Sequence, residues 1–183
     1  MILSFRRKTI PDTIGALYGA IVAQARAPAF YADYGVPDTV EGRFDLLILH
    51  VALFFRRARE EGESLRHVGQ EVFDRFCQDM DHGLREIGIS DTTLAKKMQK
   101  IGEAFYGRAA AYDTALAEAD DAALAAALER NVFGAQMASD REPAARRLAH
   151  YVRAAAENLS RQAPGEIAAG VVSFPDPLAV EAR

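Results

Sequence analysis

The stretch Leu84–Leu116, LREIGISDTTLAKKMQKIGEAFYGRAAAYDTAL, carries the clearest signals of local structure in this chain of 183 residues. An apolar periodic run ends at Ile87, and Gly88 can take the left-handed conformation that commonly ends a helix. Ser90 and Asp91 follow, and either residue can cap the first turn of a new helix. The stretch therefore predicts two helices joined within three residues.

The second of these helices combines an apolar stripe with a basic flank. At about 100° per residue, Lys96 and Lys100 fall nearly opposite the stripe. Lys97 and Arg108 lie along one of its borders. A basic arc is usually the solvated side of a helix, but a docking surface has the same pattern, and the spacing leaves both open. The stripe, which we expect in the core, consists of Leu94, Met98, Ile101, Phe105, Tyr112 and Leu116.

Length and composition bound the class of protein. A chain of this length fits one domain with a sizeable core, and 50% hydrophobic with 26% charged residues is ordinary globular composition. The formal charge of -4 argues against general nucleic-acid binding, so we expect no DNA partner. No apolar run approaches the ~20 residues that span a bilayer. We predict an all-α fold, a single compact domain over 1–183 with about six helices and an extended C-terminal tail.

The N-terminal region allows two interpretations. A basic run at 6–8 precedes a mildly apolar run at Ile14–Val22, which is the order found in a signal peptide. Pro11 and Asp12 precede the apolar run, and two glycines and a tyrosine interrupt it. These residues favour a first helix over 11–26, with proline tolerated in its first turn.

Glycine, proline and capping residues divide the rest of the chain. An aromatic loop over 28–38 is expected to anchor its rings, Phe30, Tyr31 and Tyr34, on the core. The run Leu46–Phe55 is nearly apolar all round, which is typical of a central core helix. We expect Gly62 to break the chain after it and Ser64 to restart a helix. The predicted helices are 11–26, 39–61, 65–87, 91–116, a short helix from the turn at 120–121 to 133, and 143–161, followed by an extended segment over 168–174.

Three features could carry chemistry, and each has a simpler structural explanation. His50 could ligate haem or a metal, but without a second ligand a histidine bonded to a carbonyl in the core is favoured. Asp79, His82 and Glu86 share one helix side at the spacing of helical di-metal sites, yet no matching set follows elsewhere in the sequence. Cys77 lies in an apolar run and is expected to be a buried structural thiol. We therefore expect no metal.

The sequence contains no motif that declares an enzyme. It has no glycine-rich phosphate loop, no His-Glu-x-x-His, no paired cysteines and no Gly-x-Ser-x-Gly elbow. We predict no catalytic residues and no cofactor. Two rival classes stay open at this point: a haem- or metal-handling helical protein, and a helical scaffold or regulator without a chaperone role.

Two segments resemble a known family. Residues 17–50, LYGAIVAQARAPAFYADYGVPDTVEGRFDLLILH, and residues 73–116, FDRFCQDMDHGLREIGISDTTLAKKMQKIGEAFYGRAAAYDTAL, closely resemble the ubiquinol-cytochrome c chaperone family. Its members are assembly factors for cytochrome b of the respiratory cytochrome bc complex. The resemblance is strong over about 15–116 and loose over 117–183. Its most specific pieces are LREIG at 84–88, Asp91, KKMQK at 96–100 and FYGR at 105–108.

The resemblance implies a helical, non-catalytic chaperone that holds nascent or newly inserted cytochrome b while ubiquinol-cytochrome c reductase assembles. It implies no cofactor, and a place in the cytoplasm or peripherally on the cytoplasmic face of the inner membrane. Mitochondrial members also contact the ribosome, whereas this sequence lacks their long targeting extension and looks like a compact bacterial member. The ribosome and an anionic membrane surface are further partners to be considered.

The resemblance also implies where a partner binds. We expect a groove bordered by the cations of the helix over 91–116 to shield an apolar helical client, with an exposed apolar patch beside it. Arg85 has an alternative role, as a structural pair with Glu86 linking the two helices. The predicted partner-binding residues are Arg85, Lys96, Lys97, Lys100, Tyr106 and Arg108.

Overall fold

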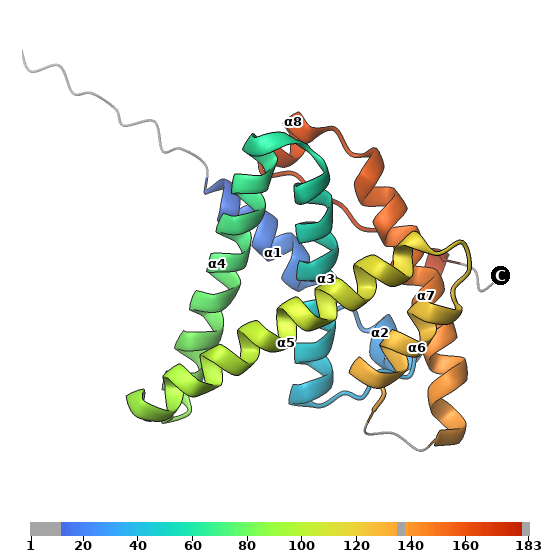
Figure 1. Cartoon of the computed structure of the whole chain (residues 1–183), viewed down its shortest axis with the longest axis horizontal. Helices are drawn as coiled ribbons and strands as arrows, with labels where there is room; N and C mark the ends of the chain where they lie inside the picture. Colours follow the sequence, from blue (N-terminus) through green and yellow to red (C-terminus); the bar gives the residue numbers. More distant parts are fainter. Residues whose placement is uncertain (1–11, 135–137, 181–183) are drawn as a thin grey trace, which may run out of the picture.

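The computed structural model describes residues 12–134 and 138–180, without the side chains of 138–140, and the basic run at 6–8 and Pro11 lie outside this range. The described residues form helices and no strands (Figure 1). This confirms the all-α prediction. The elements are α1 (Thr13–Ala25), α2 (Ala29–Ala32), α3 (Val40–Glu60), α4 (Gly62–Glu86), α5 (Asp91–Ala117), α6 (Ala122–Asn131), α7 (Ala138–Arg161), α8 (Pro164–Ala168) and the 3-10 turn η1 (Pro177–Ala179).

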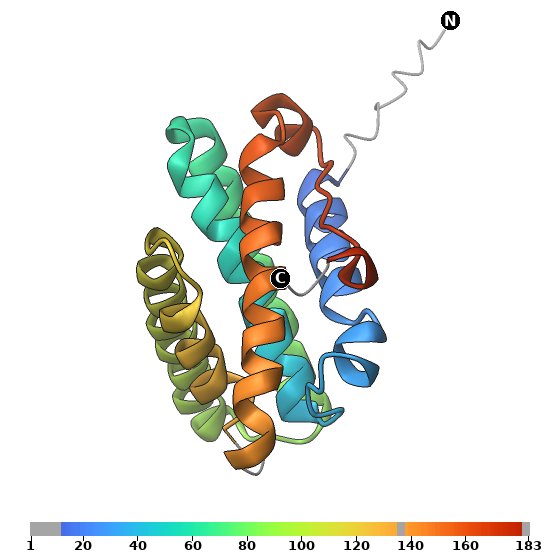
Figure 2. The ribbon, with the colours of Figure 1, turned by 90° about the vertical axis from the view of Figure 1, so that its right-hand side faces the viewer.

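α3 lies at the centre of the packing, as its apolar run predicts. Nine of the ten residues in Leu46–Phe55 are buried. A helix that is apolar on all sides needs neighbours on all sides, and α1, α4, α5 and α7 each pack against α3. In Figure 2, α7 runs down the front of the molecule, with α5 and α6 on one side and α1 on the other.

His50, in the middle of α3, is fully buried and bonded at both ring nitrogens. Nδ1 lies 2.8 Å from the carbonyl oxygen of Leu46, and Nε2 lies 2.9 Å from the hydroxyl oxygen of Tyr151 on α7. The ring of Phe30 packs against both aromatic partners, with centroids 5.4 Å from His50 and 4.7 Å from Tyr151. The preferred interpretation of this histidine, a core residue bonded to a carbonyl, is confirmed.

Arg57 is the second buried polar residue of α3, and it also connects α3 to α7. Its Nε donates to the carbonyl oxygen of Leu159 at 2.9 Å, and Nη2 donates to that of Gln162 at 3.0 Å. Nη1 pairs with Glu61 at 2.6 Å. The end of α7 has carbonyls without helical partners, and the guanidinium satisfies two of them. Arg57 thus holds the C-terminal ends of α3 and α7 together.

The joint between α4 and α5 forms where the sequence predicts it. Gly88 has a φ of 82°, its N–H bonds to the carbonyl of Arg85 at 2.9 Å, and the N–H of Ile89 bonds to that of Leu84 at 3.1 Å. This pair of bonds is the Schellman motif, which requires a left-handed residue. α5 starts at Asp91, but the side chain of Ser90 accepts no capping bond from the backbone.

Several boundaries differ from the predicted ones. α4 begins at Gly62 and not at 65, so Ser64 lies inside its first turn. α7 begins at Ala138 and passes through Pro143, which was expected to start the helix. Pro143 is the sixth residue of α7, so it removes one helical hydrogen bond, the one that an N–H at this position would donate to the carbonyl of residue 139. Two short helices, α2 and α8, fall in segments expected to be irregular.

The C-terminal tail is packed onto the body by side chains from the N-terminal part. Residues 171–176 are neither helix nor strand, as expected for an extended segment, and η1 follows them. The side-chain amide of Gln24 donates to the carbonyl oxygen of Pro175 at 3.0 Å, and the hydroxyl of Tyr34 donates to that of Pro177 at 2.7 Å. The expectation that the aromatic loop anchors its rings on the core is confirmed for Phe30 and Tyr34, which are both buried.

The burial of His50 makes the stability of the fold depend on pH. Burial lowers the pKa of His50 from 6.5 to about 4, because a charged imidazolium is poorly solvated inside the core. Below pH 6.5 the unfolded chain therefore binds more protons at this residue than the folded chain does. We expect this difference to reduce the free energy of unfolding by about 3 kcal/mol between pH 7 and pH 4. Urea titrations across this range measure it.

The matched control is His50→Gln, which keeps a polar side chain but cannot titrate. This variant should begin less stable at pH 7 and should lose less stability than the wild type on acidification. Parallel pH profiles for the two proteins would show that another group causes the loss.

Candidate partner-binding surface

The joint-proximal halves of α4 and α5 extend beyond the core. The buried residues of α4 all lie between Leu65 and Phe76, and those of α5 lie between Phe105 and Ala115 except for Leu94. Figure 1 accordingly shows the joint projecting at the lower left, away from α6 and α7. We call this projecting part, residues 81–100, the overhang, since none of its residues belongs to the hydrophobic core cluster.

Three of the predicted partner-binding residues are lysines on the overhang. Lys96, Lys97 and Lys100 are exposed, and none forms an ion pair with a described residue. The opposite side of α5 carries the predicted apolar stripe, of which Leu94, Phe105 and Tyr112 are buried and the other members are half-buried. The lysine side chains are therefore available to a partner.

Arg108, by contrast, is held inside the molecule. Its Nη1 lies 2.5 Å from Oδ1 of Asp45 on α3, and the two side chains are only 20% and 15% exposed. Burial raises the pKa of the Asp45 carboxyl, and the charge of Arg108 and its hydrogen bond partly offset this rise. The pair joins α5 to α3, and a structural role for Arg108 accounts for its position without a partner.

Arg85 links the two helices of the joint. Its Nε pairs with Asp81 on α4 at 2.8 Å, and its Nη1 pairs with Asp91 at the start of α5 at 2.6 Å. These hydrogen bonds raise the pKa of Arg85. Glu86 pairs with His82 at 3.2 Å. Arg85 therefore has the linking role considered from the sequence, but its acidic partners are Asp81 and Asp91.

Tyr106 is 51% exposed at the edge of an aromatic cluster. Its ring centroid lies 5.3 Å from Phe105, 5.4 Å from Phe73 and 6.5 Å from Phe55. Beside Phe55, the ends of α3 and α4 enclose a hollow of 660 Å³ that is also lined by Arg59 and by four residues of α4. Apolar surface and a recess thus lie next to each other on the same side as Tyr106.

The residues considered as metal ligands do not form a site. No group of three or more His, Cys, Asp or Glu side chains suited to a metal occurs in the part of the chain that the structure describes. Asp79 accepts a hydrogen bond from the hydroxyl of Tyr18 at 3.0 Å, which ties α4 to α1. Cys77 is half-buried, and burial raises the pKa of its thiol, so the reactive thiolate is disfavoured.

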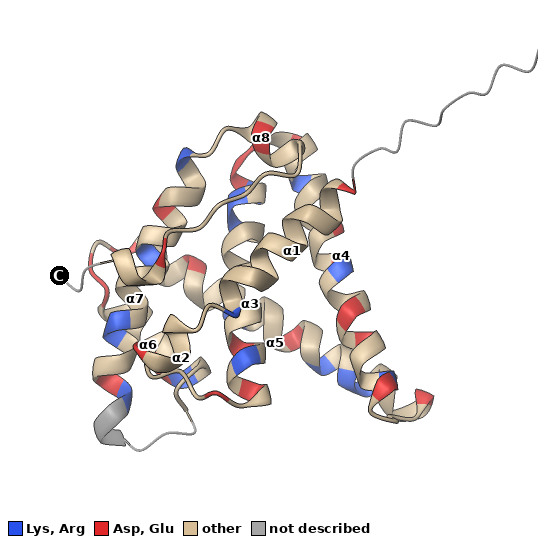
Figure 3. Cartoon of the chain, turned by 180° about the vertical axis from the view of Figure 1, so that it is seen from behind, with Lys and Arg blue, Asp and Glu red and all other residues tan. Residues whose placement is uncertain are grey.

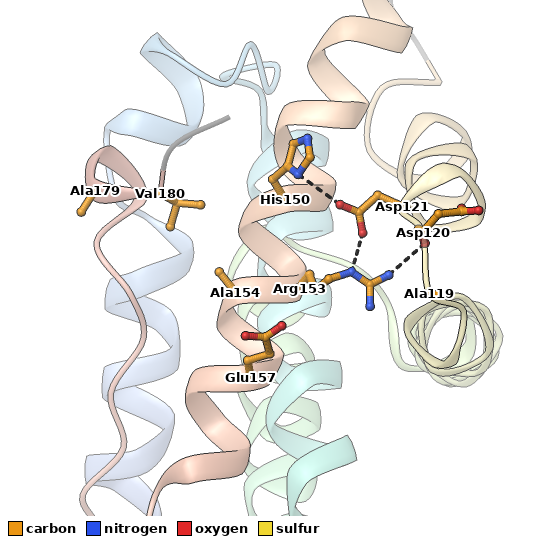
Figure 4. Close-up of a pocket in the computed structure, with 9 residues that line it drawn as sticks. All are labelled: Ala119, Asp120, Asp121, His150, Arg153, Ala154, Glu157, Ala179 and Val180. Carbon is orange, nitrogen blue, oxygen red and sulfur yellow. Dashed lines mark hydrogen bonds and ion pairs between the residues drawn. The ribbon is translucent and has the colours of Figure 1, made fainter. Parts of the chain in front are cut away.

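A polar hollow that sequence analysis missed lies between the α5–α6 connection, α7 and the tail. Its volume is 560 Å³, and Figure 4 shows His150 and Arg153 of α7 directed at Asp121. The His150 Nδ1 and Arg153 Nε atoms lie 3.1 and 2.5 Å from the carboxylate, and Arg153 Nη2 donates to the carbonyl oxygen of Asp120 at 2.9 Å.

This cluster explains how the α5–α6 connection is held rather than how a reaction is catalysed. No serine, threonine, cysteine, lysine or tyrosine lines the hollow, so His150 has no nucleophile there to activate. The one feature of the sequence that points to this cluster is the spacing of His150 and Arg153, which places them on one side of a helix. Their acidic partner lies about thirty positions earlier in the chain, at 121, and no periodicity predicts that pairing.

Comparison with known proteins gives consistent matches. The family model described as Ubiquinol-cytochrome C chaperone matches residues 32–174. The crystal structure of the Cbp3 homolog from Brucella abortus superposes with a TM-score of 0.84, at 40% sequence identity, over 92% of each chain. Ubiquinol-cytochrome-c reductase complex assembly factor 1 from Xenopus laevis is 28% identical over 137 residues, which is 75% of this chain and 67% of that protein.

The corresponding assembly factor 1 from Mus musculus is 27% identical over 137 residues. The match covers 75% of this chain but only 45% of the mouse protein, so the chain spans about half the length of this relative. In the described residues, no helix has both the length and the apolar character needed to cross a membrane.

The positions of Arg108 and Arg85 predict different effects of substitution. Arg108→Ala leaves Asp45 largely buried without its cation, and we expect a loss of about 2 kcal/mol in the free energy of unfolding. Arg85→Ala removes an exposed link and should change stability little. Adding Asp45→Asn to Arg108→Ala should recover part of the loss. Urea unfolding of the four proteins measures this, and an Arg108→Ala protein as stable as the wild type would contradict the structural role.

Proposed function

The chain belongs to the ubiquinol-cytochrome C chaperone family, and from this we propose that it is a non-catalytic assembly chaperone for ubiquinol-cytochrome c reductase that holds newly made cytochrome b. Its relatives in Xenopus laevis and Mus musculus, which are named as assembly factors of this complex, support the assembly role. The structural observations that carry the binding proposal are exposed residues of α5: Lys96, Lys97 and Lys100 lack acidic partners in the described residues, and Tyr106, on the opposite border of the apolar stripe from Lys97, is half-exposed. We call these four residues the client surface.

The lysines and the tyrosine are expected to contribute different amounts to the free energy of binding. An exposed ion pair contributes about 0–1 kcal/mol, so three lysines alone do not hold a client tightly. Burying the free half of a tyrosine ring removes on the order of 100 Å² from water, which contributes about 2 kcal/mol. We therefore propose that apolar contact at Tyr106 and the neighbouring Phe55 provides most of the affinity. The lysines guide and orient the client.

A holding role requires no chemistry from the chain. A newly made apolar segment exposes surface that aggregates unless it is covered, and an aromatic edge beside a recess can cover it. Release follows when the segment gains a better partner in the assembling complex, because the two compete for the same apolar surface. Release by this competition requires no cofactor bound to the chaperone.

The lysines also fit other negatively charged surfaces. An anionic lipid surface attracts lysines near it by about 1 kcal/mol each, and ribosomal RNA attracts them through its phosphates. We propose a peripheral position at the cytoplasmic face of the inner membrane, where newly inserted cytochrome b is reached. The ribosome is a second site at which the chain could bind the same client, as nascent cytochrome b.

The experiment is co-purification of the tagged chain from bacteria that synthesise cytochrome b. We expect cytochrome b to be recovered with the wild type, and Tyr106→Ala to reduce the recovery about tenfold, because the apolar contact is lost. Replacing Lys96, Lys97 and Lys100 by glutamate should reduce recovery at least as much, since the guiding charge is reversed. Circular dichroism and thermal unfolding should stay near wild type for both variants.

The matched control reverses the same number of charges elsewhere. Arg75, Arg130 and Arg161 are exposed on α4, α6 and α7, and their replacement by glutamate should leave recovery unchanged. Equal losses in the control and the lysine variant would show that net charge alone matters. If the wild type recovers no cytochrome b, the holding role itself is contradicted.

A further inference from the structure

A second recess lies between α1, α3 and α4, apart from the client surface. Its volume is 270 Å³. No residue of α5 lines it. Figure 3 shows α1 in front of α3 in a view from behind, whereas α5 crosses the other side of α3 in Figure 1. The recess therefore opens on the opposite side of the molecule from α5, and we call it the rear groove.

The rear groove has an apolar floor and an apolar edge. Val40 and Phe44 lie one turn apart on the first part of α3, and both face the groove together with Val22 of α1 and Met80 of α4. Val40 is 81% exposed. Polar residues are common at the start of a helix, so a valine there leaves apolar surface open at the edge of the groove. Val22, Phe44 and Met80 are half-buried, so each presents apolar surface to the recess.

The charged residues that line the rear groove are both arginines. Arg26 ends α1 and forms no ion pair with a described residue, and Arg43 lies on α3 between Val40 and Phe44. Arg43 pairs with Asp38 at 2.7 Å, at an exposed position outside the groove lining. No carboxylate lines the groove. Arg26 therefore offers an incoming group a positive charge that is unpaired among the described residues, and Arg43, whose Nε is held by Asp38, can still donate from its two Nη atoms.

The volume of the rear groove indicates what kind of ligand it can hold. A cavity of about 150 Å³ holds one benzene-sized group, so 270 Å³ holds about two large apolar side chains. Sites for whole small molecules are usually larger, at about 300–1,000 Å³. A helix that binds in a groove inserts apolar side chains that lie one turn apart, and its neighbouring charged side chains can pair with charges at the rim of the groove.

We propose that the rear groove binds a helical segment of a partner protein that presents two large apolar side chains one turn apart and carboxylates beside them. The apolar side chains enter between α1, α3 and α4, and the carboxylates pair with Arg26 and Arg43. Because the groove and the client surface lie on opposite sides of the molecule, this partner and the client bind at the same time.

The probe is a synthetic alanine-based helical peptide of about 18 residues. It carries leucine and phenylalanine four positions apart and two glutamates on the same side, and its matched partner has lysines in place of the glutamates. Fluorescence anisotropy with labelled peptide measures the affinity of the full chain. We expect the glutamate peptide to bind at least tenfold more tightly than the lysine peptide.

Variants of the chain locate the binding. The double variant Arg26→Glu with Arg43→Glu should reverse the preference between the two peptides, while Arg130→Glu with Arg161→Glu, at two other exposed arginines, should leave it unchanged. Val40→Ser removes apolar surface at an exposed first-turn position, where the fold does not depend on it, and should weaken the glutamate peptide severalfold. Co-purification of cytochrome b should remain at the wild-type level in all of these variants.

Other outcomes would overturn the proposal. Equal binding of the two peptides, or binding that Arg26→Glu with Arg43→Glu does not change, would show that the groove does not recognise the peptide. Phosphatidylglycerol vesicles that bind the wild type but not this double variant, with no peptide binding, would assign the arginines to a membrane. A dimer of the free chain that Val40→Ser dissociates would assign the groove to a second copy.

Discussion

The burial of α3 on all sides is the constraint on which the rest of this structure depends. A helix apolar around its whole circumference cannot face water, so α1, α4, α5 and α7 are each required to cover one side. The two buried polar side chains of α3 both form hydrogen bonds to α7. His50 bonds to the hydroxyl of Tyr151, and Arg57 donates to the carbonyl oxygen of Leu159. The same contacts therefore remove the cost of unpaired polar groups and fix α7 against α3.

The overhang follows from the way α4 and α5 cross α3. Figure 1 shows α5 crossing α3 obliquely, so that the part of α5 near the joint runs past the body of the molecule. Except for Leu94, the buried residues of α4 and α5 lie between Leu65 and Phe76 and between Phe105 and Ala115. The remainder, near the joint at Gly88, has no core to cover, which explains why lysines and exposed apolar residues such as Ile87 occur there.

Local patterns in the sequence predicted local structure well. The apolar run Leu46–Phe55 indicated the central helix, Gly88 indicated the joint, and the lack of a second ligand near His50 indicated a bonded core histidine. Each of these depends on residues a few positions apart. The short helices α2 and α8 were missed because four or five residues do not display a helical period.

Pairs between distant residues could not be predicted in the same way. Arg108 lies on the same border of α5 as Lys97, and nothing in the spacing distinguishes a cation that meets Asp45 across the core from one that remains in solvent. The partner is 63 positions away, and its place depends on how α5 crosses α3. The client surface remains a prediction for the same reason, since its partner lies outside this chain altogether.

The binding role of the exposed residues of α5 is tested most directly by identifying what lies against them in the cell. A photo-crosslinking amino acid placed at position 106, in cells that synthesise cytochrome b, reports which protein lies within a few ångströms of that side chain. A client-binding role for Tyr106 predicts a crosslink to cytochrome b from position 106 and none from position 130 on α6. Crosslinks to cytochrome b from position 130 but not from position 106, with assembly of the reductase intact, would contradict it.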